Sequence, residues 1–74
     1  MVYRDKTGKK IDLFPGAEFL ATDRQGRTFR YFCTGRFSYY ELILLNLDEP
    51  LECEYNETRV TSSWFAEREI EMCN

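Results

Sequence analysis

The side chains that could carry chemistry in this chain of 74 residues are its carboxylates and its cysteines, because the sequence contains no histidine. Without histidine, a Ser-His or Cys-His catalytic pair cannot form. Cys33, Cys53 and Cys73 form no Cys-x-x-Cys pair, and a structural zinc site would need a fourth ligand. We therefore expect reduced thiols, no metal and no cofactor, with a thiol reaction at Cys73 as the only enzymatic route to test.

The carboxylates and the glycines give no catalytic or phosphate-binding motif. Most acidic residues alternate with other residues in stretches that resemble strands, which is typical of a solvated sheet face. Residues 7–10 contain the letters of a phosphate loop but lack its leading glycine and its strand-to-helix context, so a plain hairpin fits them better. The sequence predicts a protein that is not an enzyme.

The charge is distributed unevenly along the chain. The net charge is −3, but residues 1–47 carry eight basic and five acidic side chains, whereas residues 48–74 carry two basic and eight acidic ones. An acidic surface can steer the protein toward another protein that has a basic surface, although solvated edge strands explain the glutamates equally well. The predicted partner-binding residues are Glu52, Glu54, Glu67, Glu69 and Glu71, with Tyr39 and Tyr40 as aromatic anchors.

The alternative function is nucleic-acid binding. Small barrels bind single strands by stacking bases on aromatic side chains beside a basic groove, and four arginines lie in or beside the aromatic stretch from residue 28 to residue 40. These are Arg24, Arg27, Arg30 and Arg36. The acidic balance of the whole chain disfavours this alternative, because the chain as a whole repels phosphates.

The stretch from residue 28 to residue 47 must organise the fold, because it is the most apolar and aromatic part of the chain. Its period of two predicts strands over 28–34 and 39–47, with a loop around Gly35. The second strand is apolar on both faces, which leaves a surplus face predicted at Phe32, Leu42 and Leu44. Either residues 2–14 cover that face, or it is kept for a partner, including a second copy in a homodimer.

The remaining segments predict a mainly β protein that forms a single domain over residues 1–74. Residues 2–14 form a hairpin with a turn at 5–8, and residues 17–23 form a strand that ends in a turn at 23–26. An acidic strand is expected over 51–56, with either a turn or a bulged continuation into 58–61. Residues 62–68 fit a short 3₁₀ or α turn capped by Ser62 or Ser63, and a last strand follows at 69–72.

The order of these elements over residues 15–74 resembles that of the SH3-like small antiparallel barrels, in which a 3₁₀ turn lies between the fourth and fifth strands. The Ala-Leu-Tyr-Asp-Tyr motif of true SH3 domains is absent, so recognition of proline-rich peptides does not follow. On this resemblance, residues 1–14 are an N-terminal hairpin or extension added to the barrel.

The length, acidity and lack of catalytic residues are similar in general character to phage-encoded inhibitors, including anti-CRISPR proteins that occupy basic nucleic-acid channels. No apolar run approaches the roughly 20 residues of a membrane span, and the N-terminus has no apolar signal region. We expect a cytoplasmic protein without a membrane partner, in the host cytoplasm if it is phage-encoded.

Overall fold

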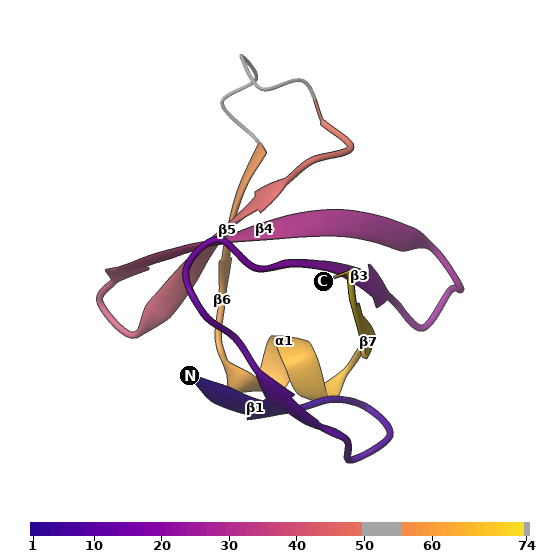
Figure 1. Ribbon diagram of the computed structural model, residues 1–74. Helices are drawn as coiled ribbons and strands as arrows, with labels where there is room; N and C mark the ends of the chain where they lie inside the picture. Colours follow the sequence, from indigo (N-terminus) through magenta and orange to yellow (C-terminus); the bar gives the residue numbers. More distant parts are fainter. Residues whose placement is uncertain (50–55, 74) are drawn as a thin grey trace.

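The computed structural model describes residues 1–49 and 56–73, which form two antiparallel sheets and one short helix (Figure 1). The elements are β1 (Val2–Arg4), β2 (Lys10–Asp12), β3 (Glu18–Thr22), β4 (Thr28–Ser38), β5 (Glu41–Asn46), β6 (Glu57–Val60), α1 (Ser62–Ala66) and β7 (Glu69–Met72). β1 pairs with β2, and the larger sheet has the order β6-β5-β4-β3-β7. The mainly β prediction, with a short helix before the last strand, is confirmed.

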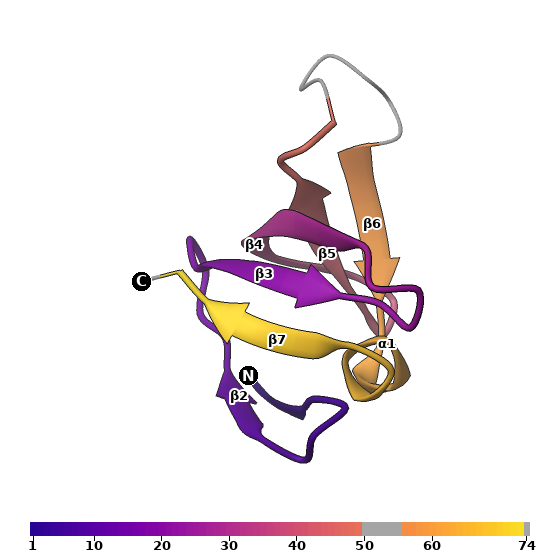
Figure 2. The ribbon, with the colours of Figure 1, turned by 90° about the vertical axis from the view of Figure 1, so that its right-hand side faces the viewer.

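The larger sheet bends strongly but does not close. In Figure 2, β5 and β6 stand upright as an antiparallel pair, whereas β3 and β7 lie across the view. β6 and β7 are the outer strands of the sheet, and among the described residues no ladder joins them. Instead, α1 connects them along the chain and packs against the end of the core. The predicted acidic strand over residues 51–56 lies almost entirely outside the described residues.

The turn at Asp23 agrees with the sequence prediction. Gly26 N–H donates to the Asp23 carbonyl at 3.0 Å, and Gly26 has a φ of +81°, which glycine adopts without strain. The Asp23 side chain accepts the N–H groups of Gln25 and Arg27, both at 3.0 Å. Local side-chain to backbone hydrogen bonds of this kind set the turn without help from the rest of the fold.

The loop predicted around Gly35 was wrong. β4 continues through Gly35 to Ser38, with a bulge in its pairing with β5 between Cys33 and Phe37. Gly35 has a φ of +74°, and an added Cβ would lie 2.6 Å from Pro15 Cγ. The glycine therefore allows the chain before β3 to approach the bulge closely, and the turn itself falls on Tyr39 and Tyr40.

The inner face of the sheet forms the core. The largest fully buried side chains are Leu13, Phe19, Cys33, Leu42, Leu44, Val60, Phe65 and Ile70. The surplus apolar face was therefore assigned to the wrong side of β5, because Leu42 and Leu44 face the core. Phe32 does not share their face, since its register partner is Leu45, whereas Leu44 is opposite Cys33. The outer face carries Phe32, Ile43 and Leu45.

The β1–β2 hairpin closes the core from below instead of covering the outer face (Figure 1). Ile11 is buried, and the Tyr3 ring stacks on Phe65 of α1 with centroids 4.2 Å apart. The hairpin over residues 2–14 is confirmed. Of the predicted surplus face, Leu42 and Leu44 share one core cluster with Ile11 and Leu13, whereas Phe32 lies on the other face of the sheet. The helix begins after Thr61, which makes no side-chain cap hydrogen bond, so neither predicted serine cap is used.

Asp5 ties the hairpin to β7. Its carboxylate accepts the Thr7 hydroxyl at 2.6 Å, the N–H groups of Thr7 and Lys9, and the Ile70 N–H at 3.1 Å. Burial by itself raises the pKa of Asp5, but the hydrogen bonds from Thr7, Ile70 and Lys9 outweigh burial and hold this pKa below its usual value. The ionised carboxylate thus joins segments 65 residues apart in the chain.

Candidate functional site

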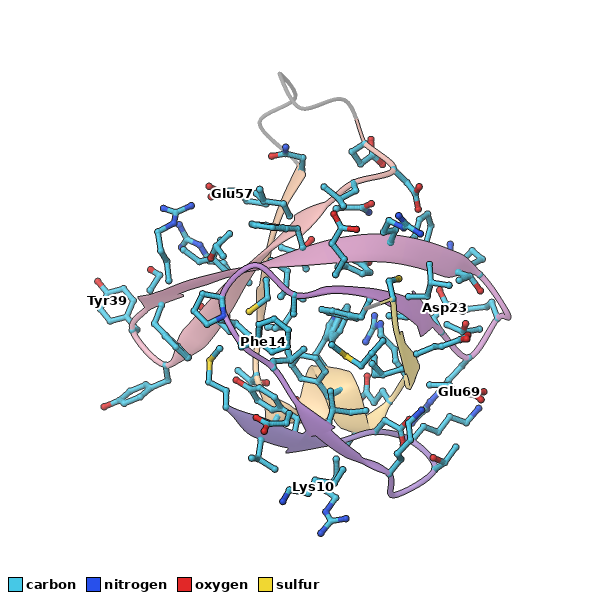
Figure 3. The ribbon with its side chains drawn as sticks, in the orientation of Figure 1. Lys10, Phe14, Asp23, Tyr39, Glu57 and Glu69 are labelled. Atoms are coloured by element: carbon cyan, nitrogen blue, oxygen red, sulfur yellow. The ribbon has the colours of Figure 1, made fainter. Side chains whose placement is uncertain are left out.

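The most exposed aromatic side chains lie at the turn between β4 and β5. Phe37 is 51% exposed, Tyr39 92% and Tyr40 93%. In the described part of the chain, they are three of five exposed large apolar side chains, the others being Val2 and Phe14. We call Phe37, Tyr39 and Tyr40 the aromatic tip, and Figure 3 shows Tyr39 projecting from the edge of the molecule.

The backbone of the aromatic tip is strained. Ser38 pairs with Glu41, so Tyr39 and Tyr40 form a loop of two residues. Tyr39 has a φ of +58° and is the only residue other than glycine with a positive φ among residues 1–49 and 56–73. A positive φ costs a non-glycine residue about 1 to 2 kcal/mol, which glycine would avoid. Turn formation therefore does not explain why tyrosine stands at this position.

The base of the aromatic tip is held firmly. The Thr34 hydroxyl donates to the Ile43 carbonyl at 2.7 Å and accepts the Arg36 N–H at 3.0 Å, which fixes the bulge. Arg36 Nη2 lies 3.4 Å from Glu57 Oε1, so the arginine nearest the tip has a carboxylate partner. Two exposed tyrosines thus stand on a rigid strand pair beside a charge-balanced ion pair.

The structure separates the predicted partner-binding residues into two places. Glu67 follows α1, and Glu69 and Glu71 lie on the exposed side of β7, opposite Thr22 and Leu20. Tyr39 and Glu69 lie on opposite sides of the molecule in Figure 3, so the tyrosines and these glutamates do not form one surface. Glu52 and Glu54 lie outside the described residues.

The surroundings of Glu67 are mixed in charge. A polar cavity of about 140 Å³ is lined by Asp23, Arg24, Gln25, Arg27, Glu67 and Arg68. The guanidinium of Arg68 lies 4.3 Å from the Trp64 ring centre, where cation–π attraction holds it. The glutamates on β7 occupy an edge strand, where charged side chains discourage pairing with other chains.

The four arginines of the nucleic-acid alternative do not line one groove. Arg24 and Arg27 lie at the β3–β4 turn, and Arg36 lies near the other end of β4 (Figure 1). Arg27, Arg30 and Arg36 form ion pairs with Asp23, Glu18 and Glu57, respectively. Tyr31 is buried in the core, so it offers no stacking surface beside them.

Cys33 and Cys73, the two thiols in the described part of the chain, show no arrangement for chemistry. Cys33 is fully buried, and burial raises the pKa of its thiol, which keeps it protonated. Cys73 is exposed, and Cys53 lies outside the described residues. Within residues 1–49 and 56–73, no three acidic, histidine or cysteine side chains gather as metal ligands. The only helix in that part of the chain is far too short to cross a membrane.

Comparison with known proteins gives no match: no family model fits the chain, and neither a curated protein nor a solved structure is significantly similar to it.

Sequence reasoning selected Tyr39 and Tyr40 but missed Phe37. The tyrosines were expected within a strand, where one of the two would face the core. Phe37 was predicted to lie in a loop and was given no role at the partner surface. The alternation of residue types does not predict the bulge that leaves Phe37 exposed. Two adjacent tyrosines between a serine and a glutamate were the only available hint of the turn.

Proposed function

We propose that this protein is a non-catalytic protein-binding module whose aromatic tip enters a pocket on a partner protein. The observation that carries the proposal is the strained, fully exposed Tyr39 beside the equally exposed Tyr40. Strain at an exposed residue indicates a role other than folding, and tyrosine is enriched among residues that dominate binding energy.

The surroundings support a partner pocket with apolar walls and hydrogen-bond acceptors. The tip itself presents aromatic rings and phenol groups, and the neighbouring Arg36 is paired with Glu57. A tyrosine buries a large ring with few rotatable bonds, which limits the entropy lost on binding. The hydrogen bond from Thr34 to Ile43 further reduces that loss, because it fixes the backbone at the base of the tip before binding.

The finer form of the proposal concerns the partner. Glu69 and Glu71 on the exposed side of β7 form a separate acidic strip, with Glu67 at the edge of the mixed-charge cavity, and this strip favours approach to a basic protein surface, such as that of a nucleic-acid-handling protein. In this form of the proposal the module acts as a phage-type inhibitor. Electrostatic attraction speeds its association with the partner, and the tip contributes most of the binding energy. This form rests on general character and charge, and it is tested separately from the tip.

The experiment is site-specific crosslinking in the native host cell. A photoreactive amino acid is placed at position 40 in the tip, at position 69 on β7, and at position 25 in the β3–β4 turn, an exposed position beside Glu67 that serves as the control for the tip. We expect one partner protein to be captured from position 40 and not from position 25. Capture from position 69 as well would support the acidic strip.

Capture from position 69 alone would reject the tip and leave the acidic strip as the site. If nothing is captured from either position while the chain is folded, the protein-binding proposal is wrong. A gel-shift assay with single-stranded DNA at low salt checks the alternative, because retention that fades steeply with salt indicates contacts with phosphates.

A further inference from the structure

The outer edge of β1 carries backbone groups that β2 does not use. Met1 and Leu13 exchange two hydrogen bonds, the Leu13 N–H to the Met1 carbonyl at 2.7 Å and the Met1 amine to the Leu13 carbonyl at 3.0 Å. In an antiparallel pair the bonded positions alternate, so Tyr3 bonds to Ile11 and the backbone groups of Val2 and Arg4 point away from β2. The edge therefore offers donors and acceptors to a further strand.

A groove lies between this edge and α1. It has a volume of about 370 Å³ and is lined by Val2, Tyr3, Arg4, Ser62, Ser63 and Ala66. The helix residues on its wall are small, which leaves room for another backbone beside β1. Tyr3 and Phe65 stack behind the groove and hold the hairpin and the helix in place.

The hairpin around the groove is basic. Arg4, Lys6 and Lys10 are exposed, and within the described residues none of them forms an ion pair. The two carboxylates of the hairpin are already engaged. Asp5 is buried and accepts a hydrogen bond from the Ile70 N–H, and the Asp12 carboxylate lies 3.6 Å from the N-terminal amine.

We propose that this groove binds an extended acidic peptide segment of a partner protein, which adds to β1 as a third strand. Its backbone would pair with Val2 and Arg4, small apolar side chains would face Ala66, and alternate acidic side chains would lie beside Arg4 and Lys10. A second copy of the chain is a poorer occupant, because pairing two β1 edges would bring two basic hairpins together. The groove is distinct from the aromatic tip, and its function does not depend on the tip.

The test uses the full ¹⁵N-labelled chain and a synthetic hexapeptide in which glutamate and valine alternate. We expect amide shifts at Val2, Arg4, Ser63 and Ala66, slower hydrogen exchange at the Val2 and Arg4 amides, and no change at the aromatic tip. A matched hexapeptide of lysine and valine should bind about tenfold more weakly, because its charges are repelled by the hairpin.

Three variants separate the contributions of the backbone, the charge and the free volume of the groove. Val2→Pro removes an N–H that β2 does not use, so it should reduce binding about tenfold while the hairpin stays paired. Arg4→Glu should reverse the preference between the two hexapeptides. Ala66→Phe fills the groove from the helix surface and should also block binding, with Trp64 fluorescence confirming the fold.

Several outcomes would overturn the proposal. The first is an absence of amide shifts at about 1 mM peptide, a concentration at which even weak strand addition becomes visible. The second is equal binding of both hexapeptides, and the third is a set of shifts confined to residues 37–40. Slow exchange of the Val2 and Arg4 amides in a dimer without peptide would assign the edge to a second copy instead.

Discussion

The two ends of β4 carry turns that are built from different kinds of residue. At one end, Asp23 accepts two backbone N–H groups and Gly26 takes the positive φ, so every residue suits its backbone position. At the other end, Tyr39 takes a positive φ with no glycine to relieve it. The first turn is optimised for folding, whereas the second accepts strain in order to expose two rings. The predictions below test whether these roles are separate.

The largest effect on stability is expected at the bulge that carries the aromatic tip. Gly35→Ala places a Cβ 2.6 Å from Pro15 Cγ at a φ of +74°, so it should lower the free energy of unfolding by about 3 kcal/mol through strain and overpacking. Gly26→Ala is the matched control. It has a similar φ of +81° but nothing within 4 Å, so it should lose only about 1 kcal/mol. Urea unfolding measures both, and equal losses would show that the contact with Pro15 is unimportant.

The next largest effect is on binding. Replacing both Tyr39 and Tyr40 by serine should weaken binding to the captured partner about thirtyfold, or about 2 kcal/mol, as expected for central interface aromatics. Replacing Gln25 by serine at the opposite turn is the control, because it changes an exposed side chain without changing the charge, and it should leave affinity unchanged. Calorimetric titration measures both. A loss of affinity at the control turn, or none at the tip, would remove the distinction between the turns.

A smaller effect of opposite sign is expected from Tyr39→Gly. Glycine relieves the positive φ, so the free energy of unfolding should rise by up to about 1 kcal/mol while affinity falls. Tyr40→Gly is the control, because Tyr40 has no strain of this kind to relieve and glycine only adds backbone entropy to the unfolded chain. Thermal unfolding compares the two. Destabilisation by Tyr39→Gly would indicate that the tyrosine ring makes favourable contacts.

The smallest effect is expected when the pH is lowered. The pKa values of Asp5 and Asp23 are both lowered, in each case because hydrogen bonds outweigh burial, so the unfolded chain binds protons before the folded one does. Their stabilisation is complete above the ordinary aspartate pKa of about 3.9 and is lost as the pH falls through the lower folded values. Asp5→Asn should flatten this acid limb in urea titrations more than Asp23→Asn, because the Asp5 carboxylate accepts four hydrogen bonds, one of them from the distant Ile70 N–H, whereas the Asp23 carboxylate accepts three, all from within four residues. The opposite order would show that Asp5 does not hold the hairpin.

Much of the fold could be read from local patterns. The hairpin at residues 2–14, the strand after Gly16, the turn at Asp23 and the short helix near Trp64 all depend on residues close in sequence. The period of two also identified β5, but it could not say which face is buried. That depends on the register with β4, which places Leu44 beside Cys33 and Phe32 beside Leu45.

The candidate site was harder to predict because it depends on the bulge. A glycine in a strand pattern signals a turn or a close backbone approach, and these have the same local signature. Only the contact between Gly35 and Pro15 shows which applies, and it moves the turn to Tyr39 and Tyr40. The separation of the tip from Glu69 follows from the strand order, which places β3 between β4 and β7.

The aspartate turns show most directly where local sequence information ends. Asp5 and Asp23 have the same local arrangement, in which the side chain accepts the N–H groups two and four residues later and a glycine stands three residues later. The sequence by itself determined both turns, because all these partners lie within four residues. Only the tertiary structure decided that Asp5 is buried against Ile70 while Asp23 stays near the surface, because that contact requires β7 to lie beside the hairpin.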